Sequence, residues 1–117
     1  MDGAALALLT TVATAIPAHA LTRTGCGART DLFKVFSIQA PGGSICFANA
    51  GEQNVAIYGV SYVASGNNVV RVRYKPGIND PAIEFGIGKW STYPLRSGSD
   101  TWKEPFVAYK IEWIKIE

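Results

Sequence analysis

The feature that most constrains this chain is a strand-and-turn pattern in its first half, with no helical period of useful length after residue 20. Residues 45–49, Ile-Cys-Phe-Ala-Asn, have the composition of a strand, and Gly51 follows Phe47 by four positions. Residues 60–65 form a second β-branched and aromatic run, which ends in the turn sequence Ser-Gly-Asn-Asn at 65–68. Such runs, bounded by Gly and Asn, are typical of antiparallel strands. The pattern predicts an all-β chain.

An order of strand, Pro/Gly loop and strand occurs before the 65–68 turn and again after it. Two four-stranded antiparallel units, each unable to bury a face alone, would pair their sheets into a sandwich. In the last strand, apolar residues change face after Trp113, which predicts a bulge near that residue. The expected strands cover residues 32–38, 45–49, 55–58, 60–65, 69–74, 82–88 and 106–116.

The first twenty residues predict a signal peptide. Residues 4–16 are an apolar run too short to span a bilayer, and residues 17–20, Pro-Ala-His-Ala, have the small residues of a secretory cleavage site. Residues 1–3 carry no Lys or Arg, which departs from the usual start of such a peptide. A buried amino-terminal helix is the alternative. Cleavage after residue 20 would leave residues 21–117 as a single domain.

Cys26 and Cys46 are the two cysteines of the chain. An even count in a chain expected to be exported favours a disulfide between them, and free buried thiols are the alternative. Closing a loop of about 20 residues would stabilise the fold by about 3 kcal/mol in the chain-entropy model.

The expected mature chain offers little equipment for catalysis. The single histidine, His19, lies in the expected signal peptide, which removes Ser-His and Cys-His pairs and most zinc sites. Glu84 and Glu112 alternate outward on expected strands, which favours solvated carboxylates over an acid–base pair. The net charge is only +2, and the basic residues do not form the clustered stripe of a nucleic-acid-binding protein. We therefore expect no enzyme, no cofactor and no specific nucleic acid partner.

The duplicated order, with Cys-Phe-Ala-Asn-Ala-Gly at 46–51, Val-Ser-Tyr-Val at 60–63 and Ser-Gly-Asn-Asn at 65–68, resembles the βγ-crystallin domain. Within that superfamily it is similar to the small secreted branch that includes the Streptomyces killer-toxin-like protein. The resemblance implies two Greek-key motifs packed as a βγ-crystallin-like β-sandwich, with Greek key 1 at about residues 31–66 and Greek key 2 at about residues 67–117. It also implies a secreted, non-enzymatic killer-toxin-like, antimicrobial (antifungal) activity.

Many βγ-crystallin domains bind calcium through acidic or amide residues and a hydroxyl pair before the closing strand. The matching windows here are residues 57–62 and 105–110, which supply no carboxylate and, at the expected place, only the hydroxyl of Ser61. Calcium takes about 6–8 oxygen ligands. The sequence therefore predicts that neither window binds a metal.

An irregular segment, residues 90–105, gathers the side chains best suited to bind a target. Aromatic and cationic groups on a loop can stack on sugars, contact a protein or lie at a lipid headgroup layer. The alternative is that the two tryptophans of this segment close the ends of the sandwich. The candidate target-binding residues are Trp90, Tyr93, Arg96, Trp102 and Lys103.

We expect a secreted, extracellular monomer that binds an unknown target-cell component, in the cell wall, in the membrane or as a protease. One alternative function is a proteinaceous metalloprotease inhibitor that presents loop 75–81 or 94–105. The other is a secreted cell-wall or host-interaction protein.

Overall fold

The computed structural model describes residues 21–98 and 107–117, so the expected signal peptide lies outside the described residues. Strands make up most of the described chain, and its helical element is the short 3₁₀ turn η2 (Pro41–Gly43). No helix in the described ranges is long and apolar enough to cross a membrane. The prediction of an all-β chain is confirmed. The strands are β1 (Thr22–Thr24), β2 (Phe33–Ser37), β3 (Ser44–Ala48), β4 (Gly51–Ala64), β5 (Val70–Lys75), β6 (Ile83–Ile87), β7 (Thr92–Pro94) and β8 (Ala108–Ile116).

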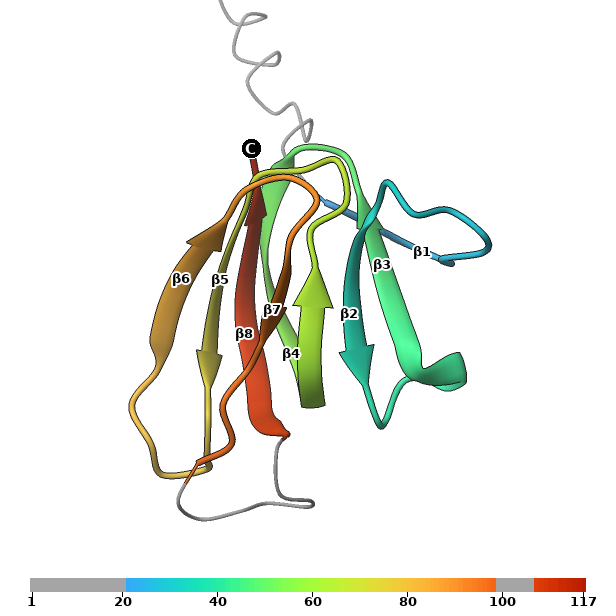
Figure 1. The fold of residues 1–117 in the computed structure, drawn as a ribbon. Coiled ribbons are helices and arrows are strands. Elements are labelled where there is room, and N and C mark those ends of the chain that lie inside the picture. Colours follow the sequence, from blue (N-terminus) through green and yellow to red (C-terminus); the bar gives the residue numbers. More distant parts are fainter. Residues whose placement is uncertain (1–20, 99–106) are drawn as a thin grey trace, which may run out of the picture.

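Strand β4 joins the whole assembly. The hydrogen-bonded order is β1-β3-β2-β4-β8-β5-β6, with β7 attached to β4 (Figure 1). The 14-residue β4 pairs with β8 between Gly51 and Val60, with β2 between Val60 and Ala64, and with β7 between Tyr62 and Ala64. Gly59 has a φ of 65° and precedes Val60, the residue at which the pairing with β8 ends and the pairing with β2 begins. Because glycine adopts this conformation without a Cβ clash, the strand can change direction there without ending.

The strands around β4 pack as a sandwich. Strand β7 has no strand pairing with β6, yet the Tyr93 ring stacks on Phe85 with centroids 3.9 Å apart. The backbone N–H of Arg96 donates to the Tyr74 hydroxyl at 3.2 Å. These contacts place the segment that contains β7 over β5 and β6, so that one hydrophobic core is shared by both layers.

The strand pairing differs from the expected separate halves. The strands expected at 55–58 and 60–65 are one strand, which already begins at Gly51. Pairing with β8 satisfies the backbone of residues 51–54, although their side chains are polar and mostly exposed. In addition, β7 from the second half pairs with β4 from the first. The expectation that each half forms its own sheet is therefore wrong.

The core follows the alternation of the strands. In the strand expected at 69–74, Val70, Val72 and Tyr74 are buried, whereas Arg71 and Arg73 point outward. The predicted bulge is also present, since Arg73 pairs with Trp113 and the next residue, Tyr74, pairs with Ile111. The extra residue on β8 is Glu112. It allows Ile111 and Ile114, three positions apart, both to be fully buried.

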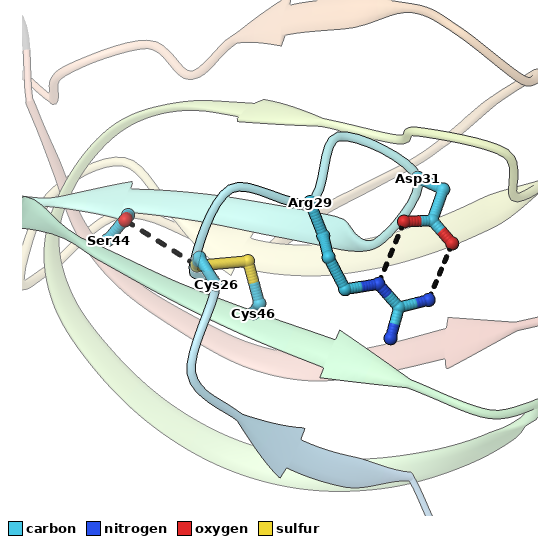
Figure 2. Close-up of a disulfide and its surroundings, with 5 residues drawn as sticks. All are labelled: Cys26, Arg29, Asp31, Ser44 and Cys46. Carbon is cyan, nitrogen blue, oxygen red and sulfur yellow. Dashed lines mark hydrogen bonds and ion pairs between the residues drawn. A yellow bond between two sulfur atoms is a disulfide. The ribbon is translucent and has the colours of Figure 1, made fainter.

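A disulfide between Cys26 and Cys46 fastens the amino-terminal segment to β3 (Figure 2). The two Cα atoms are 5.2 Å apart, and the Cys46 side chain is buried. Neither cysteine is free, so the alternative of two thiols is wrong. The bridge encloses the 3₁₀ turn and β2, and β1 pairs with β3 next to it.

Replacing both cysteines by alanine should lower the free energy of unfolding by about 3 kcal/mol, because the unfolded chain regains the entropy of an open loop of about 20 residues. Urea denaturation of the variant measures the loss. Reduction of the unmodified protein is the control and should produce a similar loss. An unchanged midpoint in both experiments would contradict the prediction.

Candidate target-binding site

The structure separates the candidate residues that it describes. Trp90 is 64% exposed, and its backbone N–H donates to the Gly66 carbonyl at 2.6 Å. Arg96 lies near the end of β5, with its backbone bonded to Tyr74. The two flank β7 on opposite sides in the chain, and Tyr93 lies between them, half-buried against Phe85. Trp102 and Lys103 lie outside the described residues.

Trp90 has an unusual backbone conformation. Its φ is 57°, and the other non-glycine residue with positive φ in the described chain is Asn49 at 70°. Asparagine tolerates this region, and here its side-chain amide donates to Thr22 Oγ1 at 2.8 Å. A bulky aromatic residue does not tolerate it, at a cost of about 1–2 kcal/mol. Backbone strain beneath an exposed indole is typical of a functional position.

The loop that carries Trp90 is held by Ser65, which is fully buried at the end of β4. The Ser65 hydroxyl donates to the Gly88 carbonyl at 2.7 Å and accepts the Ser91 N–H at 2.9 Å. The Ser65 backbone N–H donates to the Ser91 carbonyl at 2.8 Å. These bonds fix the loop on both sides of Trp90. From the sequence, Ser65 was expected only as the end of a strand and the start of a turn, because the partners that show its role are more than 20 residues away in the chain.

A third loop completes this end of the molecule. The Asp31 carbonyl accepts the Asn67 N–H at 3.0 Å and the Asn68 amide at 3.0 Å. Gly66, with a φ of 61°, packs so closely on the backbone of Asp31 that a Cβ would lie 2.6 Å from the carbonyl oxygen. The loops around Asp31, Gly66 and Trp90 are therefore one hydrogen-bonded unit.

The same end carries an exposed ion pair (Figure 2). Arg29 Nη2 lies 2.7 Å from Asp31 Oδ2, and Arg29 Nε donates to Oδ1 at 3.0 Å. The hydrogen bond from Arg29 lowers the pKa of Asp31 from its ordinary value, and a backbone hydrogen bond adds to the effect. The contribution of the pair to stability is thus present above the ordinary pKa of an aspartate. It is lost as the pH falls through the lowered value.

We call the exposed side chains of these three loops the Trp90 rim. It combines an exposed indole on one loop with polar side chains on the loops bonded to it, and such a surface can bind a partner with both apolar and polar groups. Trp90 was a candidate from the sequence, whereas the polar members were not, since most of them come from other loops of the chain. The rim consists of Arg29, Asp31, Asn67, Lys89 and Trp90.

The other sites expected from the sequence lie away from Trp90 in the chain. Arg96 lines an open groove of about 460 Å³ together with Asp80 and Pro81. In the expected inhibitory loop 75–81, Pro76 and Gly77 are buried and Ile78 is exposed.

The window 57–62, expected to have lost calcium binding, contains Ser61. The Ser61 hydroxyl donates to the Phe36 carbonyl at 3.4 Å. The described residues contain no group of three or more His, Cys, Asp or Glu that could hold a metal. The predicted loss of calcium binding stays a prediction.

The sandwich with its shared β4 is the architecture of a crystallin-like protein, and the comparisons agree. A family profile described as Beta/Gamma crystallin matches residues 35–93, just over half of the chain. The chain belongs to this family, as the sequence motifs predicted. Among solved structures, it is similar to an antifungal protein from Streptomyces tendae Tu901, determined by NMR. The identity is 31% and the TM-score 0.64, over 84% of this chain and 100% of that chain. A comparison with curated proteins found no match.

Replacing Ser65 by alanine should lower the free energy of unfolding by about 2 kcal/mol, because it leaves the Gly88 carbonyl and the Ser91 N–H without their partner. Urea denaturation measures this. Ser91→Ala is the matched control, since the Ser91 hydroxyl makes an exposed 3.3 Å bond to the Lys89 carbonyl. The control should change stability by less than about 0.5 kcal/mol. Equal losses in both variants would contradict the role assigned to Ser65.

Replacing Trp90 by glycine should make the fold more stable than replacing it by alanine, by about 1 kcal/mol, because glycine adopts a φ of 57° without a Cβ penalty. Thermal and urea denaturation measure the stability of the two variants. Because both variants lack the indole, the difference between them reports the backbone conformation alone. A more stable alanine variant would show that this backbone position is not strained.

Proposed function

We propose that this chain is a secreted, non-enzymatic killer-toxin-like, antifungal protein that acts by binding a component of the target cell. The observation that carries the proposal is the similarity to the Streptomyces tendae antifungal protein, which extends over the whole of that chain. The disulfide between Cys26 and Cys46 supports export, because such bonds persist in oxidising compartments. The signal peptide expected at residues 1–20 is part of the same proposal.

The contact with the target is made by the Trp90 rim. Burial of an exposed indole contributes a large apolar area at a small cost in side-chain entropy. The fixed loop adds to this, because a surface that is already ordered loses less entropy on binding. Lys89 and the Arg29–Asp31 pair supply polar contacts around the indole.

The state of the described carboxylates supports action by binding rather than by catalysis. Glu84 lies 3.0 Å from Arg71 and 3.6 Å from Arg73, and Glu112 lies 3.8 Å from Lys110. A glycosidase needs one carboxyl group with a raised pKa facing another across a cleft. Each of these two glutamates lies beside a cationic side chain instead.

The proposal is tested by adding the purified protein to yeasts and filamentous fungi. Growth should be inhibited or hyphal shape altered, and Trp90→Gly should raise the effective concentration at least about tenfold, a loss of about 1.4 kcal/mol in binding. Ile38→Gly is the matched control, since Ile38 is also exposed, at 51%, but lies at the far end of β2. Normal growth and morphology across a broad panel would contradict the antifungal function.

Binding assays separate the target classes. Insoluble chitin, insoluble glucan and anionic lipid vesicles are each incubated with the protein and with Trp90→Gly, and the bound fraction is measured. Binding that depends on Trp90 supports the rim as the contact surface. Inhibition of a thermolysin-type protease by a protein that leaves fungi unaffected would favour the inhibitor function instead.

A further inference from the structure

Strand β6 is an open edge of the sheet. It pairs with β5 on one side, and no described element pairs with it on the other (Figure 1). Proteins usually protect such edges with proline, with lysine or with very short strands. The other two edge strands of the described sheet, β1 and β7, have three residues each, and β7 ends in Pro94. In contrast, β6 has five residues, without proline or lysine.

The core-facing side chains of β6 are incompletely buried. Ile83, Phe85 and Ile87 are each half-buried, whereas their partners on β5 are almost completely buried. The difference arises because β5 has a neighbour on both sides and β6 has only one. A further strand beside β6 would cover these three side chains and pair the free backbone groups.

The sequence of β6 is complementary to itself in an antiparallel pair. If Phe85 lies opposite Phe85 of a second copy, Ile83 lies opposite Ile87 and Glu84 lies opposite Gly86. All five residues are then paired, and no two like charges are directly opposed, which would be destabilising. Centring the pair on Glu84 would instead oppose two carboxylates.

Charge complementarity favours the same register. A Cβ built on Gly86 would lie 3.6 Å from Cγ and Nη1 of Arg71, so the Arg71 side chain extends across this glycine. Its Nη2 atom lies 3.0 Å from Glu84 of the same chain. In the pair, Glu84 of the second copy lies opposite Gly86 and therefore faces the Arg71 guanidinium, with no side chain at position 86 between them. Two-fold symmetry produces this contact twice.

We propose that two copies of this chain associate through β6, in antiparallel register about Phe85, with ion pairs between Glu84 of each copy and Arg71 of the other. A monomer was expected from the sequence. The free edge and the position of Arg71 over Gly86 exist only in the folded chain. The association does not depend on the proposed antifungal function.

Sedimentation velocity over a wide range of protein concentration tests the association. The unmodified protein should show a reversible monomer–dimer equilibrium. Gly86→Glu should raise the dimer dissociation constant at least about tenfold, because it opposes Glu84 of the other copy. The monomer should tolerate this change, since the added Cβ would make ordinary contacts.

Gly86→Gln is the matched control of nearly the same size without the charge, and it should weaken the dimer much less. A monomer at every concentration would overturn the proposal. Equal weakening by the glutamate and the glutamine variants would overturn the ion pair and the register. A dimer that neither variant weakens would show that β6 is not the interface.

Cross-linking tests the register directly. In the proposed pair, Ile83 of one copy opposes Ile87 of the other, at a Cα separation that suits a disulfide. Under mild oxidation, a mixture of Ile83→Cys and Ile87→Cys chains should form covalent dimers, whereas either variant alone should not. Equal cross-linking within each single variant would overturn the register. Neither Cys26 nor Cys46 interferes, because both are in the existing disulfide.

Discussion

The double pairing of β4 is the constraint on which the rest of the structure depends. One continuous strand hydrogen-bonds to β8 along its first part and to β2 and β7 along its last part. Gly59 allows the change of direction between these parts. The two layers are thus joined by backbone hydrogen bonds as well as by a hydrophobic core, and a change that separates one layer also disrupts pairing in the other.

The end of β4 also determines where the candidate site lies. Ser65 follows the last residue of the strand, is buried, and bonds to the loop that carries Trp90. The strain of the Trp90 backbone is therefore opposed by hydrogen bonds within the fold. This is the arrangement expected when a rigid scaffold holds a contact residue in place, because a fixed side chain loses little freedom on binding.

Trp113 shows how a tryptophan in a structural position differs from Trp90. Its indole N–H donates to Glu52 at 3.0 Å, and the Arg73 guanidinium lies 5.1 Å from its ring. Arg73 in turn lies 3.6 Å from Glu84. These contacts connect β4, β8, β5 and β6 across the outer face of the sheet. Trp113 thus packs laterally against neighbouring strands, while Trp90 stays exposed.

The sequence by itself determined the all-β class, the bulge beside Trp113 and the family. It also favoured the disulfide that the structure contains. Each of these depends on local alternation, on residue counts or on short motifs, which can be recognised without knowing which strands are neighbours in the fold. Only the tertiary structure decided that β4 is one strand, that β7 pairs with the first half, that Trp90 and Arg96 are apart, and that Ser65 supports the Trp90 loop. The physical reason is that a period of two specifies which side chains face the core, but not which strand supplies the hydrogen bonds. That choice depends on contacts between residues far apart in the chain.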